Sequence, residues 1–190
     1  MLWFYKSFFT VAWILFYLYW QIMASRTKAT QRIEPVASRI MRVSIFLIAI
    51  VLLLPFRIPL PWLYLQLWPA GYGPFWLGAA ITIAGLLFAV WARAHLGRNW
   101  SSSVTIKQGH ELIVTGPYSV VRNPIYTGIL TGFLGMAIAI GQVRGFITVV
   151  LILFAYWTKL RMEDRWMRSQ FGEMYAEYAR RTAALVPYLF

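Results

Sequence analysis

Five apolar runs dominate this chain of 190 residues, in which 60% of the side chains are hydrophobic and 13% are charged. The runs cover residues 2–23, 43–56, 75–96, 125–140 and 145–160. A helix needs about 20 mostly apolar residues to cross the hydrocarbon core of a bilayer, and the first and third runs reach that length. An ordinary soluble domain contains far fewer apolar residues. The pattern therefore predicts an all-α, polytopic integral membrane protein with about five transmembrane helices.

The basic residues predict which helix ends share one side of the membrane. All but three of the 18 Lys and Arg residues follow the first, third and fifth runs or lie in the last turn of the third or fifth, and all 6 acidic residues follow these runs too. The exceptions are Lys6, Arg57 and Arg144. Because short cytoplasmic loops carry an excess of Lys and Arg, we expect the N-terminus outside and the polar loops in the cytoplasm. Topology thus accounts for the net charge of +12, and we expect no nucleic-acid partner.

The chain contains no Cys and only two His residues, His95 and His110. Thiolate nucleophiles and Cys-bearing zinc sites are therefore excluded, and two distant His residues do not have the spacing of metal ligands. We expect no metal, so that any catalysis uses oxygen or nitrogen groups or an organic cofactor.

Two polar blocks stand out against the apolar runs. The first is residues 108–126, QGHELIVTGPYSVVRNPIY, which Gly and Pro punctuate. The second begins with the acidic pair Glu163-Asp164 and continues with charges and aromatic residues at helical intervals. This second pattern predicts a C-terminal amphipathic helix on the membrane surface, broken once at Phe171-Gly172. We expect the function to lie in these two blocks.

The fourth apolar run opens with a helix-start signal. Pro124 suits the first helical turn and Asn123 suits the capping position, which leaves amide donors for a polar or anionic ligand group. Farther along, three glycines at helical spacing predict close contact with another helix: Gly128, Gly132 and Gly135.

Three sequence blocks together resemble one family of proteins. They are LGRNW at residues 96–100, GHELIVTGPYSVVRNPIYTG at 109–128, and EDRWM with FGEMYAEY between 163 and 178, followed by Pro187. Their order is similar to that in the integral membrane methyltransferases related to isoprenylcysteine carboxyl methyltransferase, which also have phospholipid methyltransferases as relatives. The resemblance covers the chain from residue 96 onward. It implies a single membrane domain over 1–190, with N-terminal spans in 1–95 and a cofactor-binding and catalytic half in 96–190.

The resemblance implies that a methyl group is transferred from S-adenosylmethionine to a lipophilic or lipidated acceptor among the membrane lipids. The implied cofactor contacts are Gln108, His110, Leu112, Ile113, Tyr118, Asn123, Pro124, Tyr126 and Glu163. Family members commonly carry His at the position of Asn123. Asn keeps a donor and an acceptor but cannot titrate, which favours a hydrogen-bonding role there.

Charge complementarity assigns roles to three of the polar residues. S-adenosylmethionine carries a sulfonium, an ammonium and a carboxylate, so its site needs a carboxylate at one end and a basic group at the other. Glu163 is the predicted carboxylate and Arg122 the predicted basic group. Arg161 is the first candidate to hold an acidic acceptor, and Arg165, Arg93 and Arg98 are further candidates. Catalysis would then come mainly from positioning in a dry site.

The chemistry of the acceptor leaves alternatives open. A carboxylate is already ionised at pH 7, whereas an amine must first lose a proton at a cost of about 4 to 5 kcal/mol. A carboxylate of the isoprenylcysteine kind is therefore the first choice, and a phospholipid amine is the second. An NADPH-dependent sterol-type membrane reductase and a non-enzymatic membrane protein are further alternatives.

Overall fold

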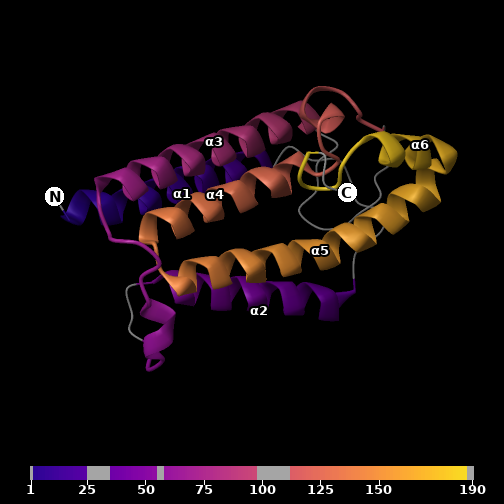
Figure 1. Ribbon diagram of the computed structural model, residues 1–190. Helices are drawn as coiled ribbons and strands as arrows, with labels where there is room; N and C mark the ends of the chain where they lie inside the picture. The colour runs from indigo at the N-terminus through magenta and orange to yellow at the C-terminus, as the bar shows by residue number, and fades with distance from the viewer. Residues whose placement is uncertain (1, 25–34, 55–57, 98–111, 188–190) are drawn as a thin grey trace.

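The computed structural model describes residues 2–24, 35–54, 58–97 and 112–187, with side chains described from residue 7. Within these ranges, every regular element is helical (Figure 1). The long helices are α1 (Leu2–Ala24), α2 (Val36–Leu53), α3 (Tyr72–Leu96), α4 (Pro124–Ile140) and α5 (Val143–Phe171), and the short ones are α6 (Glu173–Arg181) and the 3-10 turns η1 (Pro61–Tyr64) and η3 (Gly116–Ser119). The predicted all-α class is confirmed.

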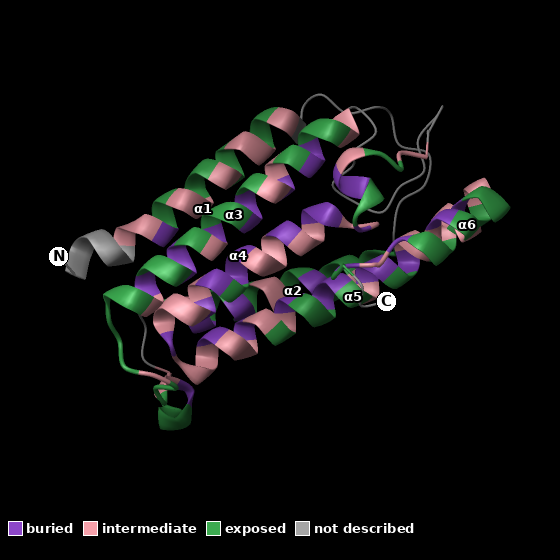
Figure 2. Cartoon of the chain, turned by 45° about the horizontal axis from the view of Figure 1, so that its top comes forward, coloured by how far each residue is buried: buried purple, intermediate pink, exposed green. Residues whose placement is uncertain are grey.

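The five long helices lie roughly alongside one another (Figure 1). Helix α3 packs on α4 and α1, whereas α5 packs on α4 and α2. Figure 2 shows buried positions where α3, α4 and α5 face one another, and many exposed positions on the outer helices. The end of α3, the start of α4, the end of α5 and the whole of α6 gather at one end of the bundle. This arrangement brings the two polar blocks of the sequence together.

Three helices are long and apolar enough to cross a membrane, namely α2, α3 and α5. Two shorter apolar helices cover residues Ser7–Met23 and Pro124–Ile140. Three of the five predicted spans thus have spanning length in the described residues. The count of five stays a prediction.

Two helices extend beyond the apolar runs that predicted them. Helix α2 begins at Val36 rather than at 43. Its buried Arg42 bonds back to Ser38, with 3.1 Å between Arg42 Nη1 and Ser38 Oγ, which satisfies the charged group inside the helix. Helix α5 continues past 160 to Phe171, and the ion pair of Lys159 with Glu163 one turn later lies where this extension begins.

The C-terminal amphipathic segment is therefore divided between two helices. Its first part is the end of α5, and its second part is α6. The predicted break is confirmed at Gly172, whose φ of 54° lies in the region that favours glycine. The change of direction there turns α6 away from the axis of α5 (Figure 1).

The contact between α3 and α4 is made by small residues, as the glycine spacing predicted. A Cβ atom on Gly128 would lie 2.5 Å from the carbonyl oxygen of Gly85. A Cβ on Gly135 would lie 2.5 Å from the carbonyl oxygen of Gly78. Thr82 adds a hydrogen bond of 3.1 Å to a backbone carbonyl of α4. The two backbones therefore touch directly, as in other membrane helix pairs with small residues at the interface.

We expect Gly128→Ala to destabilise the protein by about 1–3 kcal/mol, because the new methyl group must push two backbones apart. Gly73→Ala is the matched control, since a Cβ atom there meets nothing within 4 Å. Thermal unfolding in detergent, followed by circular dichroism, measures both variants. Equal melting temperatures for the two variants would contradict the proposed backbone contact.

Candidate active site

The centre of the candidate site is a contact between the first turn of α4 and the last third of α5. The Tyr126 hydroxyl donates a 2.9 Å hydrogen bond to Oε1 of Glu163. Lys159 Nζ lies 3.8 Å from the same oxygen and 5.1 Å from the centroid of the Tyr126 ring. The side chains of Lys159 and Glu163 are 11% and 26% exposed, so both charges are largely removed from water. The ion pair therefore offsets part of the cost of removing the Lys159 and Glu163 charges from water.

A second tyrosine forms one wall of this centre. The rings of Tyr126 and Tyr156 stack with their centroids 4.5 Å apart and an angle of 26° between their planes. Tyr156 belongs to a buried cluster with Ala49, Phe133 and Ile152, which joins α2, α4 and α5. Well-packed neighbours therefore hold the ring face of Tyr126 in place.

Helix α2 contributes a further positive charge. Arg42 is only 7% exposed and interacts electrostatically with Glu163. Together with Lys159, it places two cations around one carboxylate. Although the cluster contains an acid, the surroundings of Glu163 are therefore basic.

The segment after α6 runs beside the start of α4. The Arg122 backbone N–H donates to the carbonyl of Ala183 at 2.8 Å, and Asn123 Nδ2 donates to the carbonyl of Ala184 at 3.0 Å. These two bonds join residues about 60 positions apart. They attach the second polar block directly to the first.

Arg122 closes the same junction through its side chain. Its guanidinium donates to the carbonyls of Ala179 and Thr182, with 2.8 Å to Ala179, and Nη2 lies 3.7 Å from an oxygen of Asp164. The Tyr175 hydroxyl also donates to Asp164. Carbonyls at the end of a helix attract cations. Arg122 thus joins the end of α6 to α5.

Two more tyrosines support η3. The Tyr178 hydroxyl donates a 2.6 Å hydrogen bond to the carbonyl of Tyr118, whose own hydroxyl reaches the carbonyl of Ala92 at 3.4 Å. Burial raises the pKa of Tyr178 to about 12. Burial, with smaller contributions from Tyr178 and Glu163, raises the pKa of Tyr118 well above that of ordinary tyrosine. Both groups therefore stay protonated and act as donors at neutral pH.

Comparison with known proteins shows the family of this chain. The sequence model of the phospholipid methyltransferase family matches residues 74–174, which is more than half of the chain. The chain belongs to this family. The matched region runs from the start of α3 to the start of α6 and contains the whole Tyr126–Glu163 contact.

The curated proteins that are similar to this chain have names that describe different functions. The "Cobalt-zinc-cadmium resistance protein CzcN" of Cupriavidus metallidurans is 35% identical over 117 residues, which are 60% of this chain and 52% of the relative. "Protein-S-isoprenylcysteine O-methyltransferase B" of Arabidopsis thaliana is 24% identical over 115 residues, which are 59% of this chain and 58% of the relative. "Phosphatidyl-N-methylethanolamine N-methyltransferase" of Emericella nidulans is 37% identical over 71 residues, which are 37% of this chain and 33% of the relative. The chain thus spans about half the length of curated relatives that it matches.

The structure brings some of the predicted cofactor contacts together. Tyr126 bonds to Glu163, and Glu163 lies near enough to Tyr118 to contribute to the raised pKa of that tyrosine. Gln108 and His110 lie outside the described residues.

The other predicted contacts take supporting places. Pro124 is buried at the first position of α4, as expected, and Asn123 precedes it at the capping position. The Asn123 side chain makes no capping bond, because it donates to Ala184 instead. Ile113 packs against the cluster that contains Tyr118, and Leu112 is half-buried.

Arg161 lies away from the other predicted residues. Its guanidinium carbon is 4.9 Å from the centroid of the Trp157 ring, and the side chain is exposed. Positions two apart on a helix point about 200° apart, so Arg161 and Glu163 face different sides of α5. The structure does not bring Arg161 to the Tyr126–Glu163 contact.

Sequence reasoning missed three residues near Glu163. Tyr156 and Lys159 share its side of α5, and their spacing of three and four positions was a usable signal. Lys159 was instead interpreted as a topology charge. Arg42 had no local signal, because its position depends on how α2 packs along α5. No group of three His, Cys, Asp or Glu residues suitable for a metal occurs in the described ranges.

Asn123→Asp should loosen the segment after α6, because it places a carboxylate oxygen against the carbonyl of Ala184. We expect this docking to weaken by about 1–3 kcal/mol, the cost of an unsatisfied polar pair. Tryptic cleavage after the exposed Arg181 should then be faster than in the parent.

Gln21→Glu is the control, since it makes the same exchange of NH₂ for oxygen at an exposed position of α1. Equal cleavage rates in the two variants would show that the Asn123 bond does not hold the segment.

Proposed function

We propose that this protein is a membrane methyltransferase that uses S-adenosylmethionine and methylates a lipophilic acceptor. The observation that supports this proposal most is the Tyr126–Glu163 hydrogen bond, because it brings together two of the sequence blocks that resemble the family. Membership of the phospholipid methyltransferase family supports the same reaction class. The domain over 96–190 is the proposed cofactor-binding and catalytic half.

The residues around Glu163 suit the charges of S-adenosylmethionine. A largely buried carboxylate complements a sulfonium or an ammonium, and the ring faces of Tyr126 and Tyr156 add the attraction of aromatic rings for cations. The cofactor, when bound, supplies a methyl group on a positively charged sulfur. Gln108, His110, Leu112, Ile113, Tyr118, Asn123 and Pro124 are the proposed remaining contacts.

The protein's own groups would act by positioning. Tyr126 holds one oxygen of Glu163 with its hydroxyl proton, which orients the carboxylate between α4 and α5. Arg122 fixes α6 and the following segment beside the start of α4. In this proposal, Glu163 binds and orients the cofactor, whereas Arg122 is a positioning residue.

A carboxylate is the proposed acceptor. Lys159 and Arg42 place two positive charges near Glu163, which can attract an anionic acceptor group. Arg161 was the first candidate to hold that acid, but it faces another side of α5. We therefore propose Lys159 and Arg42 for this role.

A phospholipid amine is the second candidate acceptor. It is favoured by the family description and by the similarity to the Emericella nidulans N-methyltransferase. An amine would need a group to accept its proton, and Glu163 is the carboxylate at hand.

We propose that the N-terminus lies outside and the site faces the cytoplasm. The ends of α1, α3 and α5 and the start of α2 lie at the end of the bundle that holds the site (Figure 1). These are the helix ends beside the basic segments of the sequence. The positive-inside preference then places this end in the cytoplasm.

Glu163→Gln should weaken S-adenosylmethionine binding about tenfold or more, because a desolvated charge pair contributes about 1.5–3 kcal/mol. Titration calorimetry on purified protein in detergent measures the affinity. Glu173→Gln is the matched control, since Glu173 is exposed on α6 and pairs only with Arg180 among the described residues. Absence of binding by the parent protein would overturn the proposed function.

The acceptor can be identified from the methylated product. Membranes with and without the protein receive S-adenosylmethionine with a labelled methyl group, and labelled lipids are analysed by mass spectrometry. A carboxylate acceptor gives a methyl ester that mild base hydrolyses, with release of the label. If the label stays on a headgroup nitrogen after base treatment, the acceptor is a phospholipid amine and the proposed carboxylate acceptor is wrong.

A further inference from the structure

The outward face of α5 carries one continuous stripe of side chains. Its first half is apolar: Val150, Phe154 and Trp157 are 63%, 52% and 44% exposed. Their spacing of four and three positions places them on one line along the helix. In a bilayer, this line would face the acyl chains.

The second half of the stripe is basic. Arg161, Arg165 and Arg168 continue the same line at spacings of four, four and three from Trp157. They occupy about 10 Å of the helix axis. They also line a surface groove of about 620 Å³, whose lining residues are Trp157, Thr158, Arg161, Asp164, Arg165 and Arg168. The apolar and basic halves meet where Arg161 stacks on the Trp157 ring.

The charges of this groove are not balanced within the described part of the chain. None of its three arginines has a salt bridge to a described residue, and Arg165 donates its Nε to the carbonyl of Arg161 at 3.1 Å. Asp164, the acid of the groove, is already held by Arg122 and Tyr175. Among the described residues, the three arginines therefore leave the groove with a net positive charge.

We propose that this groove binds the phosphate headgroup of an anionic phospholipid, whose acyl chain lies along Trp157, Phe154 and Val150. Arginine matches phosphate because its planar fork can donate two parallel hydrogen bonds. Tryptophan is enriched where headgroups meet hydrocarbon. A free phosphate would use only the basic half of the stripe, whereas a lipid uses both halves.

This lipid site is separate from the proposed methyl-transfer site. Arg161 and Glu163 face different sides of α5, and the groove does not include Glu163. The lipid can therefore bind whether or not the protein is a methyltransferase.

Native mass spectrometry of the whole protein in detergent, titrated with dioleoylphosphatidylglycerol, tests the proposal. We expect the parent to bind this lipid at least tenfold more tightly than dioleoylphosphatidylcholine. Arg161→Gln/Arg165→Gln/Arg168→Gln should lose at least tenfold in affinity, because each basic residue near a membrane surface contributes about fivefold. Equal binding of both lipids by the parent would overturn the proposal.

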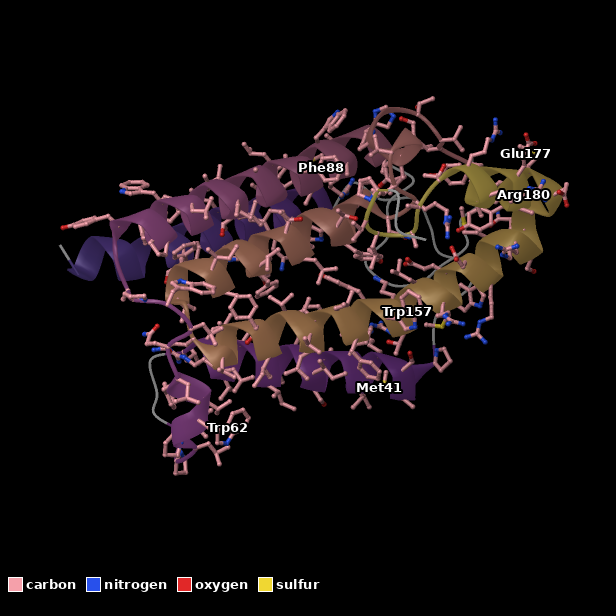
Figure 3. All side chains as sticks on the ribbon, in the orientation of Figure 1. Met41, Trp62, Phe88, Trp157, Glu177 and Arg180 are labelled. Carbon is pink, nitrogen blue, oxygen red and sulfur yellow. The ribbon has the colours of Figure 1, made fainter. Side chains whose placement is uncertain are left out.

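Arg39→Gln/Arg180→Gln/Arg181→Gln is the matched control, because it removes the same charge from exposed positions elsewhere (Figure 3 labels Arg180 on α6 and Trp157 on α5). An equal loss in this control would show that net charge alone attracts the lipid.

The single variant Arg165→Gln should fold normally, since the described contact of Arg165 is to its own helix backbone. Its affinity for the lipid should fall about fivefold. If millimolar inorganic phosphate displaces all of the lipid, the groove is a site for free phosphate and the proposed lipid site is wrong.

Discussion

The direct contact between the backbones of α3 and α4 is the constraint on which the remaining structure depends. Glycines on both helices let the two backbones approach so closely that an added Cβ atom would meet the backbone of the other helix. Tyr126 lies two residues before Gly128, the glycine nearest the start of α4. The position of its ring and hydroxyl is therefore determined by an apolar contact deep in the bundle. The polar chemistry at one end depends on van der Waals packing in the middle.

The polar groups at that end form two connected layers. Tyr126, Glu163 and Lys159 form the inner layer between α4 and α5. Arg122 and Asp164 form the outer layer, which links α5 to α6. Isolated charges at such burial would be costly, but each carboxylate here has a cation and a tyrosine hydroxyl as partners. The cost of removing water is thus offset inside the protein, which leaves a rigid and mostly basic surface around Glu163.

Much of this fold could be predicted from the sequence, because apolar length, Gly spacing and Pro124 are local signals. Helix boundaries were less predictable: α5 continues into a charged segment that a hydropathy pattern alone assigns to a separate helix. The pairing of Tyr126 with Glu163 was implied only by resemblance to a family, since 37 positions separate them. Arg42 was unpredictable because its role depends on tertiary packing. The expectations for Gln108 and His110 stay predictions.

The attachment of Ala183 and Ala184 to the start of α4 has a consequence for how the protein matures. These residues leave the ribosome after every described helix, so the helices can insert in the membrane before the junction beside Arg122 exists. A nascent chain at that stage has its spans but not its finished polar end. Because binding stabilises only the state that binds, a ligand held at the first turn of α4 would also strengthen the docking of this late segment. Ligand affinity would therefore report whether the newly made protein has finished folding.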